Sequence, residues 1–190
     1  IRNCNNEKNL MTCILETERL KVCITQLSDL DNLISLRTNP EVMRCLGGFG
    51  QEFGTGVIQD KKEIKKQLDL TQGYFDKYGL GFFCVFEKET GNFIGQAGLF
   101  HLRFNTKQPD IELAYRLYKK YWGKGYATEL AKSLIKWGFE KHKLSKIIAP
   151  VHPGNERSIR VLQKAGMTYK EDICYKGHMI PCYVILCCDK

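Results

Sequence analysis

The sequence contains no hydrophobic run close to the roughly 18 residues that a membrane-spanning helix requires. Its first ten residues are also too polar for the apolar core of a secretory signal peptide. No internal repeat and no low-complexity tract interrupts the chain. These absences lead us to expect a cytoplasmic protein in which residues 1–10 form a mobile tail and residues 11–190 form a single domain.

The nine cysteines are odd in number, and no two of them have the spacing of a C-x-x-C pair. Zinc sites and redox motifs commonly use that spacing, so we expect neither a metal site nor a structural disulfide. Cys23, Cys84, Cys174 and Cys182 lie in strand-like runs, where a reduced thiol behaves as a small apolar side chain. The cysteines are therefore expected to be free thiols.

The 190 residues are 43% hydrophobic and 26% charged, which is typical of one globular domain with a sizeable core. The formal net charge of +8 is compatible with a nucleic acid, an acidic partner or an anionic cofactor. The lysines at positions 61–66 fit the solvated face of a helix. Lys119, Lys120 and Lys124 instead surround a glycine-rich turn, where a polyphosphate would be bound.

The pattern of apolar residues predicts an α+β domain built on one mixed, mostly antiparallel sheet of about seven strands flanked by helices. The expected order of elements is β-α-α-β-β-β-α-β-α-β-β. Strands are expected at residues 13–25, 82–87, 93–102, 110–117, 146–151, 167–174 and 183–188.

The helices are expected to begin at capping residues. Ser28 and Asp29 precede a short helical segment that ends before Asn39-Pro40, and Asp60 precedes the next helical segment. Residues 47–56 between these two segments have the composition of a glycine-rich loop. The clearest helix begins near Ala127, because apolar residues recur there at i, i+3, i+4 and i+7 spacing. Asn155 is expected to cap the last helix.

The most informative segment is Tyr121-Trp122-Gly123-Lys124-Gly125-Tyr126-Ala127-Thr128. Gly123 and Gly125 remove Cβ atoms that would keep an anion from the backbone, and the following helix would direct its unpaired N–H groups at that anion. A dinucleotide-binding G-x-G-x-x-G motif would need glycine where Thr128 stands, and the G-x-x-x-x-G-K-[ST] loop is absent. The sequence therefore favours another kind of phosphate cradle, with a ligand-free turn as the alternative.

Three local patterns, taken in this order, resemble the GNAT acetyltransferase superfamily over about residues 16–188. They are Thr17-Glu18-Arg19-Leu20; Ile111-Glu112-Leu113-Ala114-Tyr115 leading into the glycine turn and Glu129; and Asn155-x-x-Ser158 followed by Val161-Leu162-x-x-Ala165-Gly166-Met167. Within the superfamily, the chain is similar to the ribosomal-protein N-acetyltransferase-like group. Its Tyr-Trp-Gly-Lys-Gly form of the loop is common there, although Trp122 departs from the general Gln or Arg.

The resemblance implies that acetyl-coenzyme A (acetyl-CoA) is the co-substrate and that no metal takes part. The backbone of Leu117 and Tyr118 would pair with the pantetheine arm like an added strand, and Asn155 and Ser158 would contact that arm. The pyrophosphate would be held by Trp122, Gly123, Lys124, Gly125, Tyr126, Ala127 and Thr128.

Acetyl transfer to an amine needs a base, a donor for the oxyanion and an acid for the departing thiolate. The resemblance implies the Leu117 N–H as the oxyanion donor, and Glu112 is the candidate base; a carboxylate facing outward from its strand is the alternative. Many relatives use a tyrosine as the acid, but Leu162 stands at that position. Ser158 is therefore the candidate acid, while a purely structural pairing with Asn155 at the helix N-terminus is the alternative.

No cysteine lies in a matched motif, so direct attack in a ternary complex is preferred to a covalent enzyme intermediate. The acceptor, a protein N-terminus or a small-molecule amine, is expected between residues 47–56, the following helix and the last hairpin. A catalytically silent RNA- or ribosome-binding module on the same fold is the rival hypothesis, because it would explain the charge of +8. No RNA-recognition motif is present, which argues against a nucleic-acid partner. No membrane partner is expected either, and the protein would be a monomer or homodimer.

Overall fold

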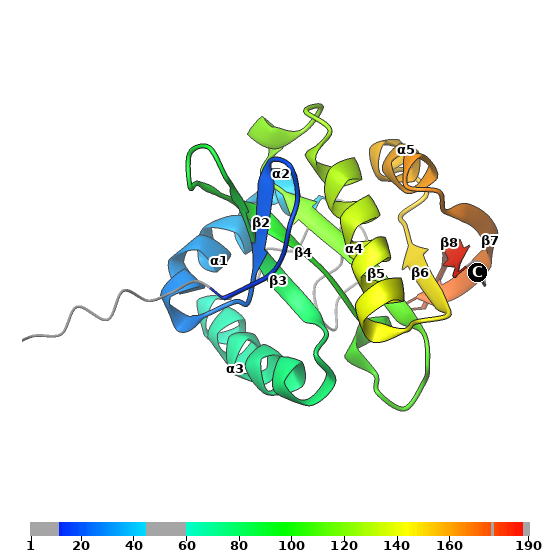
Figure 1. The fold of residues 1–190 in the computed structure, drawn as a ribbon, viewed down its shortest axis with the longest axis horizontal. Coiled ribbons are helices and arrows are strands. Elements are labelled where there is room, and N and C mark those ends of the chain that lie inside the picture. Colours follow the sequence, from blue (N-terminus) through cyan, green and yellow to red (C-terminus); the bar gives the residue numbers. More distant parts are fainter. Residues whose placement is uncertain (1–11, 45–59, 176, 188–190) are drawn as a thin grey trace, which may run out of the picture.

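The structure, a computed structural model of the chain, describes residues 12–44, 60–175 and 177–187. Its strands are β1 (Cys13–Glu16), β2 (Leu20–Cys23), β3 (Gly81–Glu87), β4 (Phe93–His101), β5 (Ile111–Leu117), β6 (Lys146–Pro150), β7 (Thr168–Tyr175) and β8 (His178–Leu186). They form one sheet in the order β1-β2-β3-β4-β5-β6-β8-β7, in which β5 and β6 are parallel and the other neighbours antiparallel (Figure 1). The α+β class and the mixed, mostly antiparallel sheet are confirmed, with eight strands where about seven were expected.

The additional strand arises because the predicted strand at residues 13–25 is a tight hairpin. The Leu20 N–H donates to the Thr17 hydroxyl at 2.9 Å, and the Thr17 N–H donates to the Leu20 carbonyl at 2.9 Å. A threonine that bonds nearby backbone in this way favours a turn. The polar residues at positions 16–19 interrupt the apolar pattern and include this turn, although the whole segment was predicted as one strand.

The same hairpin contains a disulfide between Cys13 and Cys23, which lie opposite each other in β1 and β2. The expectation of no structural disulfide is therefore wrong for this pair. A hairpin can bring together two cysteines that are far from C-x-x-C spacing, and the sequence pattern did not show that a hairpin was present. Cys84 and Cys182 are buried free thiols, as expected for strand cysteines.

The helices are α1 (Leu30–Arg37), α2 (Pro40–Met43), α3 (Lys61–Tyr78), α4 (Tyr126–His142) and α5 (Glu156–Lys164), with short 3-10 helices η1 (Leu27–Asp29), η2 (Leu102–Phe104) and η3 (Lys119–Tyr121). Successive residues of β3 show which helix covers which face of the sheet, because they point to opposite sides. Phe83 belongs to the cluster formed with α4, and Cys84 belongs to the cluster formed with α1 and α3. The sheet therefore lies between α4 on one face and α1 and α3 on the other.

The predicted caps are partly confirmed. The Asp60 carboxylate accepts a hydrogen bond from the Lys62 N–H at 3.2 Å and begins α3. Asp29 precedes α1, but its carboxylate accepts from the Gln26 N–H at 2.8 Å and closes the turn before the helix. The expected tail at residues 1–10 and most of the chain between α2 and α3, including the glycine-rich loop at 47–56, lie outside the described residues. No helix that the structure describes is long and apolar enough to cross a membrane.

Two glycines provide a matched test of this packing. A Cβ atom on Gly98 of β4 would lie 1.9 Å from the Gly81 carbonyl oxygen, whereas a Cβ atom on Gly73 of α3 would meet nothing within 4 Å. We expect Gly98→Ala to lower the free energy of unfolding by about 2–3 kcal/mol, because the backbone must move. Gly73→Ala should instead raise it by about 1 kcal/mol, since alanine is the better helix former. Thermal unfolding of both variants tests this. Equal unfolding midpoints would contradict the close approach of β4 to β3 at Gly98 and Gly81.

Candidate active site

The glycine turn forms an open cradle of backbone amides. Gly123 and Gly125 have φ angles of 74° and 82°, which L side chains rarely adopt, and α4 begins at Tyr126 without a side-chain cap. Across residues 12–44, 60–175 and 177–187, nothing accepts a hydrogen bond from the amides between Gly123 and Thr128. A Cβ atom on Gly123 would meet nothing within 4 Å, so the space above the turn is open. Unpaired amides at the N-terminus of a helix are suited to binding an anion.

A second row of open backbone groups lies where β5 and β6 separate. Their one register pair among the described residues joins Glu112 to Ile148. The Tyr118 N–H donates to the Ile94 carbonyl of β4 at 3.0 Å. Because successive residues of a strand direct their backbone groups to opposite edges, the Leu117 N–H points toward β6. The Leu117 N–H therefore faces the gap between the two strands and is available as a hydrogen-bond donor.

The structure explains why tryptophan stands at the first position of the turn. The Trp122 indole N–H donates to the Leu117 carbonyl at 2.8 Å, and the Arg157 guanidinium lies 5.4 Å from the indole ring. Trp122 thus joins the end of β5 to the glycine turn by a side-chain bond. Tyr118 uses its N–H for β4 and its carbonyl for the Tyr121 N–H, whereas Leu117 uses only its carbonyl, so the Leu117 N–H is the open backbone group of the two.

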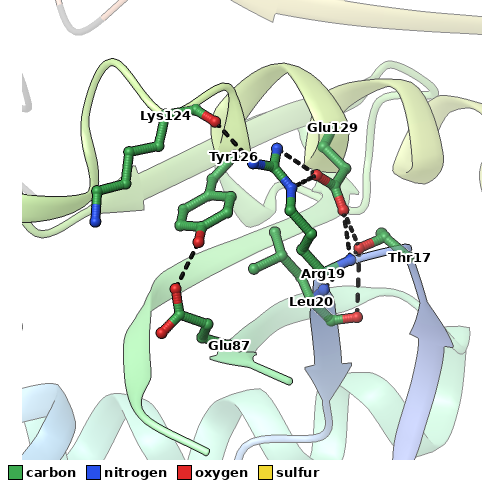
Figure 2. A network of polar contacts seen from close by, with 7 residues as sticks. All are labelled: Thr17, Arg19, Leu20, Glu87, Lys124, Tyr126 and Glu129. Atoms are coloured by element: carbon green, nitrogen blue, oxygen red, sulfur yellow. Dashed lines mark hydrogen bonds and ion pairs between the residues drawn. The ribbon is translucent and has the colours of Figure 1, made fainter. Parts of the chain in front are cut away.

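A network of polar contacts attaches the β1–β2 turn to the first turn of α4 (Figure 2). The Arg19 guanidinium donates to the Glu129 carboxylate at 2.7 Å and to the Lys124 carbonyl at 3.0 Å, and it lies 4.5 Å from the centroid of the Tyr126 ring. Glu129 also accepts from the Thr17 hydroxyl and from the Arg19 N–H. The Thr17-Glu18-Arg19-Leu20 motif therefore holds the glycine turn in place.

The same contacts neutralise a carboxylate that lies beside the cradle. Burial raises the pKa of Glu129, but hydrogen bonds from Thr17 and Arg19 outweigh burial and lower that pKa below its ordinary value. On the other side of the turn, the Tyr126 hydroxyl donates to Glu87 at 2.5 Å and lowers the pKa of Glu87. Tyr126 is buried, so its ring supports the turn while its backbone N–H remains open to a ligand.

The lysines around the turn have different surroundings. Lys119 forms an ion pair with Glu41 of α2. The ammonium groups of Lys120 and Lys124 lie 5.1 Å and 5.4 Å from the centroid of the Tyr121 ring. Lys120 and Lys124 are thus the better placed of the three to attract a polyphosphate, because Lys119 already has a carboxylate partner.

Glu112, the candidate base, is buried with 6% of its surface exposed. Its carboxylate accepts from the Arg103 N–H at 3.3 Å and lies 3.5 Å from the Tyr175 hydroxyl. Burial and then the charge of Glu112 raise the pKa of Tyr175, so this phenol is neutral. The alternative of a carboxylate that faces outward from its strand is wrong.

Ser158, the candidate acid, has the predicted structural contact and a further one. The Asn155 side-chain oxygen accepts from the Ser158 N–H at 3.2 Å and caps α5. The Ser158 hydroxyl lies 2.7 Å from the hydroxyl of Tyr115 on β5, whose pKa is raised because burial outweighs the bond to Ser158. Leu162, where relatives have a tyrosine, is buried in the core. Tyr115 therefore brings a phenolic O–H to the side of α5 where Leu162 leaves none.

The candidate base and acid lie on opposite faces of β5. Residues 112 and 115 are an odd number apart along the strand, so Glu112 faces α1 and α3 whereas Tyr115 faces α4 and α5. Sequence reasoning missed Tyr175 and the role of Tyr115, because no local pattern indicates a contact with Glu112 or Ser158. In the part of the chain that the structure describes, no group of three or more histidine, cysteine or acidic side chains could hold a metal ion.

Comparison with known proteins connects this geometry to a family. Residues 19–168 match the family model of the acetyltransferase (GNAT) domain. The chain is 31% identical over 160 residues to the uncharacterized protein YkkB of Bacillus subtilis, covering 84% of this chain and 87% of that protein. It is 32% identical over 176 residues to the uncharacterized N-acetyltransferase p20 of Bacillus licheniformis, covering 90% and 93%. The structure of an acetyltransferase from Agrobacterium tumefaciens superposes with a TM-score of 0.74 at 26% identity, covering 90% of this chain and 92% of that one.

The contact between Arg19 and Glu129 makes a prediction about stability and pH. We expect Glu129→Gln to lower the free energy of unfolding by roughly 2 kcal/mol at pH 7, because several hydrogen bonds to a charged group are weakened. A carboxylate with a lowered folded pKa stabilises the protein fully above its unfolded pKa of about 4.3, and that stabilisation is lost as the pH falls through the folded pKa. The difference between wild type and Glu129→Gln should therefore shrink in acid.

Glu140→Gln is the matched control for this measurement, because Glu140 forms an exposed ion pair with Lys136 on the same helix at 4.0 Å. It should change the free energy of unfolding by less than about 0.5 kcal/mol. Urea unfolding between pH 3 and pH 7 measures both variants. If the loss in the free energy of unfolding were equal for the two variants, or independent of pH, it would contradict a stabilising contact between Arg19 and Glu129.

Proposed function

Because the chain belongs to the GNAT acetyltransferase family, we propose that it moves an acetyl group from acetyl-CoA to a primary amine by direct attack in a ternary complex. The observation that carries this proposal is an open amide cradle at Gly123–Thr128 next to the end of β5, where the Leu117 N–H has no strand partner among the described residues. A ligand with an anionic group followed by an extended amide chain could bind the cradle with its anion and the end of β5 with its amides. Coenzyme A has a pyrophosphate and a pantetheine arm in that order.

The residues present fit this co-substrate. The amides from Gly123 to Thr128 would hold the pyrophosphate, with Lys120 and Lys124 near its charge. The edge of β5 that ends at Leu117 would lie beside the pantetheine arm, and Asn155 would orient that arm, since the Asn155 amide nitrogen has no acceptor among the described residues. Bound acetyl-CoA would supply the acetyl group as a thioester.

The roles of the protein groups follow from the two faces of β5. Glu112 would take a proton from the amine on the face of α1 and α3, directly or through water. The Leu117 N–H would stabilise negative charge on the carbonyl oxygen. On the opposite face, the paired hydroxyls of Tyr115 and Ser158 would supply a proton to the departing thiolate. Tyr115 is added to the residues that the sequence indicated, because its hydroxyl is in contact with Ser158.

The acceptor class is left open by the relatives. Solved structures with the same fold include a spermidine N-acetyltransferase from Vibrio cholerae in complex with CoA and spermine, and the aminoglycoside acetyltransferase AAC(6')-Ib in complex with coenzyme A. They also include the RimL ribosomal L7/L12 alpha-N-protein acetyltransferase in complex with coenzyme A. Their identities to this chain are 18%, 15% and 12%, so they support the fold alone. A protein N-terminus and a small-molecule amine both remain hypotheses, and the comparisons give the RNA-binding alternative no support.

Binding of the co-substrate is tested by a charge placed in the cradle. Gly123→Asp and Gly123→Asn introduce side chains of equal size that tolerate a positive φ, and the added Cβ atom meets nothing within 4 Å. We expect Gly123→Asp to bind acetyl-CoA at least tenfold more weakly than Gly123→Asn, since a carboxylate repels the pyrophosphate. Acetyl-CoA at 100 times its dissociation constant should raise the unfolding midpoint of the wild type by roughly 5–11 °C.

Thermal-unfolding shifts measured with acetyl-CoA, ATP and NAD provide the readout and the controls. A rise that is selective for acetyl-CoA and larger in Gly123→Asn than in Gly123→Asp is the expected result. If acetyl-CoA produced no shift in the wild type, or equal shifts in the two variants, the cradle would not be a co-substrate site.

The hydroxyl pair is tested by its effect on turnover. We expect Tyr115→Phe and Ser158→Ala each to lower kcat about tenfold or more while leaving the KM for acetyl-CoA nearly unchanged, because an acid acts in the transition state. The double variant should lose little more than the stronger single variant if the two hydroxyls act as a unit. Ser133→Ala on α4 is the control. An unchanged kcat in Ser158→Ala would leave Ser158 with its capping role alone.

A further inference from the structure

A row of polar side chains crosses the face of the sheet that α1 and α3 cover. Cys84 of β3 lies opposite Gln96 of β4, and Gln96 lies opposite Arg116 of β5. Residues directly opposite each other in a sheet share a face, so these three side chains lie side by side. Arg37, the last residue of α1, reaches the same row through Gln96. Two guanidinium groups thus meet on the face that also presents Glu112.

Arg37 is buried and bonded to neutral oxygens. Its guanidinium donates to the side-chain oxygen of Gln96 at 3.2 Å and to that of Gln67 on α3 at 2.7 Å. Gln67 in turn lies 3.4 Å from the Glu63 carboxylate, so an acidic group reaches Arg37 only through an amide. Burial lowers the pKa of Arg37 to about 10.

Arg116 has still weaker compensation. Its guanidinium lies 4.7 Å from the centroid of the Phe82 ring, and one terminal nitrogen lies 3.9 Å from the Met43 sulfur. The Arg116 residue is partly buried, and its Nε atom is buried and has no hydrogen-bond partner in the part of the chain that the structure describes. Burial, followed by the nearby charge of Arg37, lowers the pKa of Arg116 below its ordinary value. None of the ion pairs formed by residues 12–44, 60–175 and 177–187 includes Arg37 or Arg116.

Buried charges in folded proteins are paired or hydrogen-bonded, because removing a charge from water without compensation is costly. Two adjacent guanidinium groups with neutral partners therefore form an incomplete site. An oxyanion would complete it, and a carboxylate matches the planar fork of a guanidinium with two parallel hydrogen bonds.

We propose that Arg116, supported by Arg37, binds a carboxylate carried by the amine acceptor. This inference rests on the proposed acetyltransferase function. Glu112 and Arg116 are four residues apart on one face of β5, which corresponds to about 13 Å along the strand. An acceptor lying along this face would present its amine toward Glu112 and its carboxylate toward Arg116. The substrate class is therefore a peptide, or an amine with a long chain, that carries its carboxylate several bonds away from the amine.

The same charges select against another class of acceptor. A polyamine or an aminoglycoside carries several positive charges, and two uncompensated guanidinium groups would repel it. The acceptors named for the spermidine and aminoglycoside enzymes of the same fold should therefore be poor substrates here.

The test compares amines that differ only in one carboxylate. Glycine, 4-aminobutyrate, 6-aminohexanoate and a tripeptide with Asp at its second position are paired with their carboxamide counterparts, and spermidine is added as a polycation. Release of the coenzyme A thiol gives kcat/KM for each. In the wild type, we expect kcat/KM for at least one carboxylate to exceed kcat/KM for its carboxamide counterpart tenfold or more. Spermidine should have the lowest kcat/KM of all. In Arg116→Met the ratio should fall to within twofold of one.

Lys136→Met, which removes an exposed charge from the helix on the opposite face, should keep the wild-type ratio. Ratios near one throughout the wild-type panel, a ratio unaffected by Arg116→Met, or no turnover with any amine in protein that binds acetyl-CoA would overturn the carboxylate site. Failure to bind acetyl-CoA at all would instead overturn the proposed function, so the two failures are distinguishable.

A stability measurement separates binding from a structural role. Because Arg116 has no anionic partner among residues 12–44, 60–175 and 177–187, Arg116→Met without ligand should unfold at the wild-type midpoint or above it. A midpoint several degrees below the wild type would show that Arg116 is compensated within the folded chain, and would overturn the inference.

Discussion

The functional region depends on a gap between β5 and β6, which opens where Pro150 cannot donate a backbone hydrogen bond to β5. In the parallel ladder between β5 and β6, the pair Glu112 and Ile148 places the next donor of β6 at Pro150. Proline has no N–H, so the ladder cannot continue from that residue. The two strands then separate, and the edge of β5 at Tyr115 and Leu117 is left without a strand partner. Buried backbone groups require partners, so an extended ligand that supplies them can take the place of the missing strand.

The second constraint is the charge beside the cradle. Glu129 lies in the first turn of α4, where a carboxylate is favourable for the helix but competes with any anion that binds the same amides. Arg19 resolves this conflict from the β1–β2 turn, because it pairs with Glu129 and also bonds the Lys124 carbonyl. The hairpin at the N-terminal edge of the sheet is thereby connected to the glycine turn. A short motif that contributes no group to the chemistry can thus determine how well a phosphate is held.

The sequence was sufficient for features whose signal is local. The glycine turn, the start of α4 near Ala127 and the Asn155 cap depend on neighbouring residues, and the structure has them as predicted. Contacts between distant residues had no such signal. The Thr17 and Glu129 side chains are 112 positions apart, and Tyr175 and Glu112 are 63 apart. The disulfide at Cys13 and the additional strand were missed for a related reason, since both depend on a turn at residues 17–19 that contains no glycine, proline or asparagine to mark it.

The separation of β5 from β6 also determines which reaction course is open. Donor and acceptor reach the same strand from its two faces, because Tyr115 and Glu112 point in opposite directions. A covalent route would need a thiolate near Glu112, and Cys182 of β8 is a buried free thiol close enough to feel the charge of Glu112. Burial, followed by nearby carboxylates that include Glu112, raises the pKa of Cys182 to about 11, so it remains a protonated thiol near neutral pH. This supports the proposal that the acceptor amine is itself the nucleophile on this face and attacks acetyl-CoA directly within a ternary complex.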